Sequence, residues 1–311
     1  MKKYLATVVS VSALVATSAV AFAADLPSRK EAAIAPAPQL WTGFYAGLNA
    51  GGMIGTTNSV STNGYSTFDW ASGALSMPLG FTSPYRTGNA NVNQGGVIGG
   101  GQIGYNYQFN KNFILGFETD FQGAGFSGSG SSYGLTSTTD RNGTIHLQQG
   151  QVSTNAGIGW LGTARARIGY LITPSLLVFG TGGFAYGNTY ANVSTYGFHW
   201  HPQDEPSHPH PPNAVTPTFT SSNTVSAGWT VGGGAEWMFV NNWSAKLESL
   251  YYNLGSQNVF GQYSPLINND APNSIALINA ATTKVDYQGV IIRAGVNYHF
   301  NFASAPVVAK F

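Results

Sequence analysis

Between Gly157 and Tyr170 the chain reads GIGWLGTARARIGY, and apolar and polar side chains alternate along this stretch. One parity carries apolar side chains, namely Trp160, Ala164, Ala166, Ile168 and Tyr170. The other parity carries polar ones, namely Thr163, Arg165 and Arg167. Residues two positions apart lie on the same face of a β-strand. The stretch therefore predicts a strand with one apolar face and one face that carries two cations.

The same alternation recurs in seven other segments. They span residues 44–53, 95–109, 113–122, 176–186, 226–239, 243–252 and 285–300. In the Gly-rich segment 176–186 the facing is weakly marked, and we expect Val178, Phe184 and Tyr186 outside. The apolar faces carry no charged residue, whereas a Lys or Arg that faces lipid at mid-bilayer costs ~2–4 kcal/mol. The fold class is therefore predicted to be all-β, as an eight-stranded antiparallel transmembrane β-barrel.

The connections between these segments alternate between short and long. The short ones lie at residues 110–112, 172–175 and 240–242, and the long ones at 54–94, 123–156, 187–225 and 253–284. Short periplasmic turns and four long extracellular loops are typical of outer-membrane barrels, and an even strand number leaves both termini in the periplasm. None of the 15 prolines falls inside a proposed strand, which fits because proline removes a ladder hydrogen bond.

The composition excludes other classes of protein. Charged residues make up 8% of the chain, with 40 Gly, 13% aromatic residues and no Cys, whereas soluble domains carry about 25% charged residues. A soluble β-sandwich, the main rival, would show charged outer faces and hide its aromatic residues in a core. A helical membrane protein would show long apolar runs, and none follows Ala23. No basic stripe indicates nucleic-acid binding.

The ends of the chain predict export. Lys2 and Lys3 precede an apolar run that ends in Ala21-Phe22-Ala23, which predicts a signal peptide over residues 1–23, with a membrane anchor as the alternative. We expect a Pro/Ala-rich linker at 24–40, the barrel at 41–300 and a tail at 301–311. Gly295, Tyr298 and Phe300 have the spacing of a barrel insertion signal, and the alternative is that Phe311 ends the last strand.

Several motifs resemble one family. WTGFYAGLNAGG from Trp41, WLGTARARIGY from Trp160, TGGFAYG from Thr181 and RAGVNYHF from Arg293 are similar to the small outer-membrane proteins of alphaproteobacteria. These belong to the OmpA-like barrel group, and some are known as outer membrane immunogenic proteins or small porins. The resemblance implies an eight-stranded barrel without a catalytic site, haem-like ligands for some members and uncertain pore activity.

Eight charged residues are predicted to face the lumen. The acids are Glu118, Asp120, Glu236 and Glu248, and the bases are Arg165, Arg167, Lys246 and Arg293. An eight-stranded barrel is only wide enough for its own side chains, so these charges must pair or remain unpaired at high cost. They predict either a salt-bridged core that plugs the barrel or an ion path that opens when the pairs rearrange. Acid–base catalysis is not favoured, because each carboxylate is expected to meet a cation.

One predicted loop is rich in histidine. His199, His201, His208 and His210 alternate with prolines there, near Asp204 and Glu205. Imidazole and carboxylate groups bind zinc, copper or nickel, and imidazole binds haem iron. The alternative is a polar surface loop, because its prolines keep the chain extended. No cofactor is otherwise indicated.

We therefore expect a structural protein of the Gram-negative cell outer membrane, and not an enzyme. The alternatives are a narrow porin for ions or small solutes and a protein that binds haem or metal through the His-rich loop. The expected partners are outer-membrane lipid and lipopolysaccharide, the barrel assembly machinery and periplasmic chaperones, with no nucleic acid.

Overall fold

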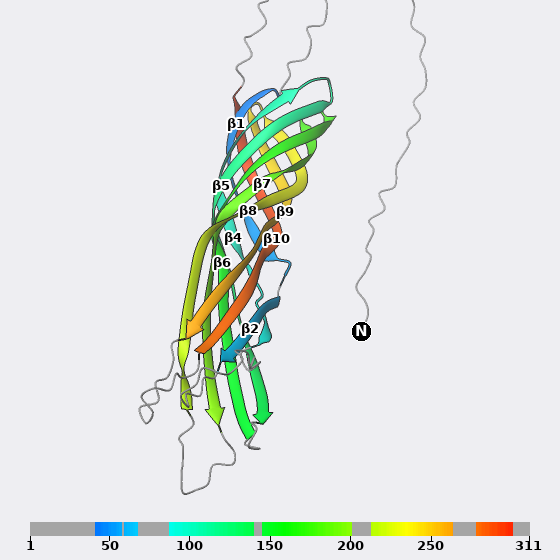
Figure 1. Cartoon of the computed structure of the whole chain (residues 1–311). Helices are drawn as coiled ribbons and strands as arrows, with labels where there is room; N and C mark the ends of the chain where they lie inside the picture. The colour runs from blue at the N-terminus through cyan, green and yellow to red at the C-terminus, as the bar shows by residue number, and fades with distance from the viewer. Residues whose placement is uncertain are drawn as a thin grey trace, which may run out of the picture. The chain divides into compact units, whose positions relative to one another are not determined.

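The computed structural model describes residues 41–57, 59–67, 87–139, 145–200, 213–263 and 278–300, and these form strands joined by turns and short connections (Figure 1). The strands are β1 (Gly43–Gly55), β2 (Ser59–Thr67), β3 (Gly88–Asn91), β4 (Gly95–Gln108), β5 (Phe113–Thr139), β6 (Ile145–Thr173), β7 (Leu176–Trp200), β8 (Asn213–Val240), β9 (Trp243–Tyr263) and β10 (Ile278–Phe300). Among these residues no helix has the length and apolar character needed to cross a membrane.

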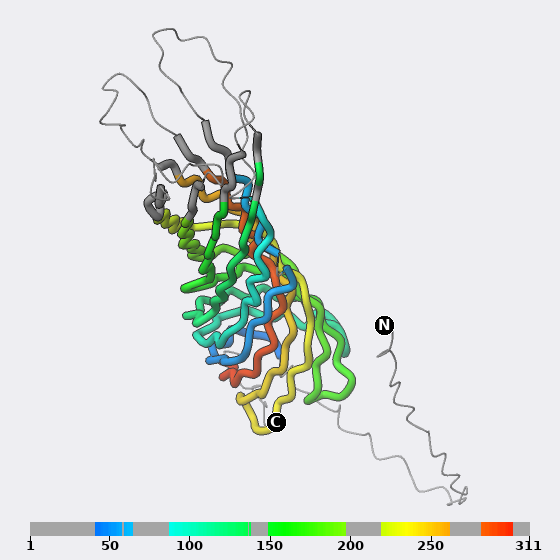
Figure 2. Tube along the Cα trace, turned by 90° about the horizontal axis from the view of Figure 1, so that it is seen from below, coloured from blue at the N-terminus to red at the C-terminus, as the bar shows by residue number. Residues whose placement is uncertain are grey.

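Eight of these strands close into a ring. The order is β1-β4-β5-β6-β7-β8-β9-β10, and β10 pairs back onto β1 in antiparallel register, for example Leu48 with Val296. Each neighbouring pair is antiparallel. The strands run side by side around the ring, and the short turn between β8 and β9 lies at one end of it (Figure 2). The predicted eight-stranded antiparallel barrel is confirmed.

The short connections are tight turns. In the turn between β4 and β5, Asn110 Oδ1 accepts hydrogen bonds from the backbone N–H groups of Asn112 (3.0 Å) and Phe113 (2.8 Å). In the turn between β8 and β9, Asn242 adopts a left-handed backbone with φ of 71°, which asparagine tolerates better than most residues. These residue types therefore fix the reversals at the turn end of the barrel.

The strands extend further than the sequence predicts. Much of each segment expected to be a long loop is strand: β5 continues to Thr139, β6 begins at Ile145 and β7 continues to Trp200. β8 even contains Pro217, which lies beside the register shift between Thr195 and Gly197 of β7. A bulge is one of the few places where a sheet admits proline. The predicted strands are therefore too short at their loop ends, and Pro217 lies in a part of β8 that was predicted to be a loop. The predicted alternation of short and long connections is confirmed.

The first long connection contributes two further strands. β2 pairs with the far end of β10, where Thr62 lies opposite Thr283, and β3 pairs with β2. β1 stops at Gly55 and β4 begins at Gly95, so β2 continues the wall beside β10 beyond the end of β1 (Figure 1). The barrel wall therefore extends well beyond the loop end of β1.

The chemistry of the two faces inverts along each long strand. In the half near the turns, outward side chains are apolar and inward ones are polar, as predicted; in β10 the outward residues there include Ile292 and Val296, and Arg293 faces inward. Further along the same strand, Lys284 faces outward and Val285 and Tyr287 are buried inside. We call the first part the transmembrane half and the second the loop-end half. The loop-end half has the pattern of a barrel surrounded by water.

Aromatic side chains mark the two edges of the transmembrane half. At the turn end, Phe113 contacts Tyr170 and Trp243 contacts Tyr298, each pair with ring centroids 5.1 Å apart. At the other edge, the contacts are Phe121 with Trp160 (5.2 Å), Trp160 with Tyr186 (6.0 Å) and Trp229 with Tyr251 (5.4 Å). Two such girdles are typical of the two interfaces of a bilayer.

The charged lumen as candidate functional site

Each of the eight charged residues predicted to face the lumen is buried there. None has more than 4% of its surface exposed, although the apolar outer faces beside them are open. They come from five strands of the ring: Glu118 and Asp120 from β5, Arg165 and Arg167 from β6, Glu236 from β8, Lys246 and Glu248 from β9, and Arg293 from β10. We call this set the charged layer.

Arg165 contacts three carboxylates in the charged layer. Its Nη2 lies 2.5 Å from Glu118 Oε1 and 2.9 Å from Asp120 Oδ2, and its Nη1 lies 2.7 Å from Glu248 Oε1. Glu118 is its direct neighbour across β5 and β6, whereas Glu248 belongs to β9, which does not pair with β6. Arg165 therefore spans the lumen and ties strands that share no backbone ladder.

Two further cations complete this part of the layer. Arg293 donates to Asp120 Oδ2 at 2.8 Å and to Glu248 Oε2 at 2.7 Å. Lys246 Nζ lies 2.8 Å from Glu118 Oε1 and donates to Gln102 Oε1 at 2.9 Å. Each of these carboxylates thus faces at least two cations, which offsets the cost of removing the charges from water.

A second group of residues lies around Arg167. Its guanidinium forms an ion pair with Glu236 and lies over the ring of Phe179, 3.8 Å from the centroid. Glu236 Oε1 also accepts hydrogen bonds from Ser244 Oγ (2.6 Å) and Asn297 Nδ2 (2.7 Å), and His299 Nε2 lies 3.3 Å away. Packing on an aromatic face suits the weakly hydrated guanidinium group.

Tyr45 joins the two groups, and charge alone did not identify it. Its hydroxyl donates to Glu118 Oε2 at 2.7 Å and accepts from Arg167 Nη1 at 3.3 Å. Its ring lies across Gly104, where a Cβ atom would stand 2.4 Å from it. Gln102, Ser244 and Asn297 were likewise not predicted as partners. All face inward, so the parity of the strands was the signal that could have found them.

An apolar cluster covers the charged layer at the turn end. It consists of Trp41, Ile114, Leu171, Leu177, Phe179 and Met238. Trp41, which precedes β1, is 1% exposed, donates from Nε1 to the backbone oxygen of Pro174 (2.9 Å) and packs its ring against His299. We call this set the turn-end cluster.

A larger apolar core covers the charged layer on the other side. It includes Met53, Ile98, Phe126, Ile158, Leu250, Tyr252, Val285, Tyr287 and Ile291. Of these residues only Phe126 lies in a segment that was predicted to be a loop, and the others lie in predicted strands, all except Ile158 on the inward parity. Because the inward faces were expected to be polar, this apolar core was not predicted. We call it the loop-end core. The described lumen therefore consists of three successive layers: apolar, charged and apolar.

The remaining predicted site residues are only partly placed. His199 lies in β7, where its backbone is opposite Gln148 and Asn213; His201, His208 and His210 lie outside the described residues, so the metal or haem site stays a prediction. In the part that the structure describes, no group of His, Asp and Glu could hold a metal ion. Tyr298 and Phe300 lie on the outer face at the end of β10, with ring centroids 5.1 Å apart, and Gly295 lies in the same strand.

Comparison with known proteins identifies relatives of this chain. The sequence profile of the outer membrane protein beta-barrel domain matches residues 8–300. The 31 kDa outer-membrane immunogenic proteins of Brucella melitensis biotype 1 and Brucella suis biovar 1 are each 35% identical to this chain over 294 residues, which are 94% of this chain and 97% of the relative. Among solved structures, the outer membrane protein OprG from Pseudomonas aeruginosa is 11% identical, with 84% of this chain and 98% of that chain covered and a TM-score of 0.33.

Proposed function

The chain belongs to the outer membrane protein beta-barrel domain family and resides in the cell outer membrane, and on that premise we propose that it is a structural, non-conducting and non-catalytic barrel. In this proposal the transmembrane half anchors the chain in lipid, next to lipopolysaccharide, and carries the loop-end half on the cell surface. Residues 1–23 direct export, and the end of β10 at Phe300 provides the signal that the barrel assembly machinery reads.

The observation that carries this proposal is the filled lumen. Side chains that line an open water path would be exposed to water, yet the charged layer is at most 4% exposed and most of both apolar clusters less than 6%. An ion in transit would have to separate buried pairs and then cross the loop-end core, whose mainly apolar side chains would not replace its hydration. This arrangement favours the plugged core over the narrow porin.

The same contacts argue against acid–base chemistry at these carboxylates. A catalytic acid or base needs access to substrate and a proton to exchange. Glu118, Asp120 and Glu248 instead contact guanidinium or ammonium groups in a layer closed on both sides. The charged layer therefore has an electrostatic role, in which it fixes the register of the strands.

Electrical recording in planar bilayers tests the proposal. The purified chain, folded in detergent and reconstituted, is expected to give rare and small events, while an open porin in the same bilayers gives steady conductance. Migration on SDS gels that changes on heating verifies that the sample is a folded barrel. Large, steady and well-resolved conductance from the unmodified protein would overturn the proposal in favour of the porin.

A further inference from the structure

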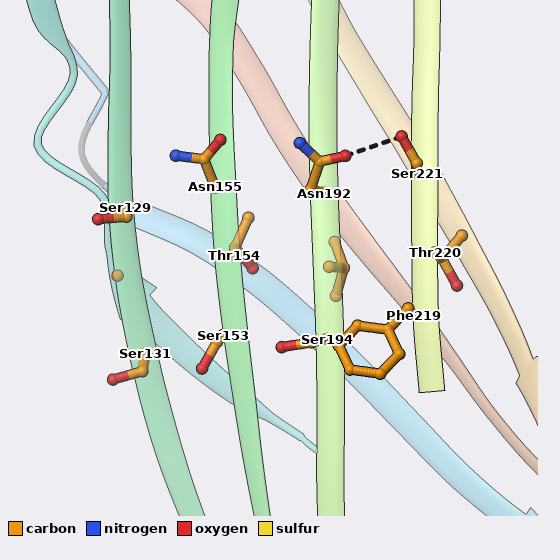
Figure 3. Close-up of a pocket in the computed structure, with 12 residues that line it drawn as sticks. Ser129, Ser131, Ser153, Thr154, Asn155, Asn192, Ser194, Phe219, Thr220 and Ser221 are labelled. Atoms are coloured by element: carbon orange, nitrogen blue, oxygen red, sulfur yellow. Dashed lines mark hydrogen bonds between the residues drawn. The ribbon is translucent and has the colours of Figure 1, made fainter. Parts of the chain in front are cut away.

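The outer face of the loop-end half carries a groove of about 770 Å³ that crosses β5, β6, β7 and β8 (Figure 3). Two rows of side chains on neighbouring strands lie in register along it. The first row is Ser129, Asn155, Asn192 and Ser221. The second row is Ser131, Ser153, Ser194 and Phe219.

The rows form a regular grid of small polar groups. Neighbouring strands lie about 4.8 Å apart, and residues two positions apart on a strand are separated by about 6.8 Å. Seven of the eight grid residues carry a hydroxyl or an amide, and the groove has no charged residue in its lining. Ser221 Oγ donates to Asn192 Oδ1 at 2.7 Å, which directs the amide nitrogen of Asn192 away from Ser221 (Figure 3).

Phe219 ends the second row and is 79% exposed. It lies opposite Ser194 across β7 and β8, and in Figure 3 its ring lies next to Ser194 at the side of the groove. An aromatic ring beside a row of hydroxyl groups offers one apolar face and several hydrogen-bond partners. This combination suits a ligand that has both kinds of surface.

We propose that this groove binds an uncharged glycan chain, laid across the four strands with one sugar ring against Phe219. Sugar hydroxyls both donate and accept hydrogen bonds, as serine hydroxyls and asparagine amides do, and the C–H faces of a sugar ring pack on aromatic rings. A polyanionic or polycationic ligand would find no counter-charge in the groove. The spacing between neighbouring strands is comparable to the length of one sugar unit, so successive units would meet successive strands.

The position of the groove supports a ligand from the cell surface. The groove lies on the loop-end side of the aromatic edge formed by Phe121, Trp160 and Trp229, which places it outside the hydrocarbon layer. Glycan can reach it from two sources, either the saccharide of neighbouring lipopolysaccharide or a free polysaccharide. The shared chemistry is the uncharged polyhydroxyl chain.

Binding to the full chain in detergent micelles tests the proposal with three probes. These are dextran, the neutral polysaccharide released from lipopolysaccharide by mild acid, and heparin as a polyanion. Phe219→Ala removes the ring and Ser153→Tyr fills the centre of the grid. The matched controls are Phe260→Ala and Ser256→Tyr on β9, which are exposed residues outside the groove.

At least one neutral probe is expected to bind, and both groove variants to bind it about fivefold to tenfold more weakly, while the controls bind as the unmodified protein does. Binding of only the lipopolysaccharide-derived chain assigns the membrane as the source, and binding of dextran as well assigns the chemistry without a preferred source. Absence of neutral binding at millimolar concentration, equal binding of heparin, or equal loss in groove and control variants refutes the proposal. If Ser153→Tyr does not give a heat-modifiable barrel, Phe219→Ala alone decides, because its side chain is exposed.

Discussion

Replacement of Arg165 by Gln removes the most connected cation of the charged layer. Arg165 is 0% exposed and contacts Glu118, Asp120 and Glu248 within 2.9 Å. The change leaves three cations to balance four carboxylates, and a glutamine cannot reach all three partners. Since breaking a buried ion pair by removing one partner costs about 3–5 kcal/mol, we expect the free energy of unfolding to fall by about that amount.

The measurement is urea unfolding of the protein in lipid vesicles, followed by tryptophan fluorescence. The expected result is a lower midpoint with an unchanged slope. The matched control is Lys284→Gln, because Lys284 is 56% exposed and lies 3.7 Å from Asp286; exposed pairs contribute about 1 kcal/mol or less. Adding Glu248→Gln to Arg165→Gln restores a balance of three cations and three carboxylates, so the double variant should lose less than the sum of the single losses.

The reasoning fails if Arg165→Gln and Lys284→Gln are equally stable. It also fails if the losses in the double variant are additive, because additivity would mean that Arg165 and Glu248 act independently. Either result would show that the layer is hydrated in the membrane, and the ion path would then become the better interpretation of these charges.

Ala164→Arg should impair insertion, measured as the heat-modifiable fraction, because a charge that faces hydrocarbon costs ~2–4 kcal/mol. The control Ser127→Arg, on the loop-end half, should insert normally. Trp41→Ala should lower the free energy of unfolding, measured in urea, by about 3–5 kcal/mol. Bilayer conductance should stay low in this variant, because the charged layer and the loop-end core remain. A large increase in conductance would show that Trp41 alone closes the lumen. Haemin or zinc should bind weakly to the His-rich loop, and the affinity should fall as the pH drops through about 6.5, because neutral imidazole is the ligand. The test is a variant in which four histidines are replaced by Ala: His199, His201, His208 and His210. If its titration is identical to that of the unmodified protein, the site is refuted.

The facing of the strands in the membrane was predictable because lipid imposes a strict rule. A charge on the outer face is so costly that the parity of Arg165 or Glu248 alone identifies the inward face. The ends of the strands were not predictable by the same rule. Beyond the hydrocarbon the outer face becomes polar, so Ser127 to Ser131 looked like a loop although β5 continues through them.

The partners within the lumen were also beyond the sequence. Parity states that Arg165 and Glu248 both face inward, but their contact depends on the curvature of a ring in which β6 and β9 are not neighbours. Strand adjacency correctly indicated the contact of Arg165 with Glu118. Tyr45 carried no charge to mark it, and Trp41 lies before the first strand, so neither was identified as part of the closed lumen.

The lengths of the strands indicate where this protein meets its surroundings. About 9–11 residues suffice for a strand to cross the outer membrane, yet β6 has 29 residues and β8 has 28. The additional residues do not lengthen a channel, because inside the loop-end half they build an apolar core. Outside, the residues that alternate with them present hydroxyl and amide groups in register across four strands. A barrel that served only as an anchor would need none of this wall, so interaction at the outer surface of the loop-end half is a more economical explanation of its length than transport through the lumen.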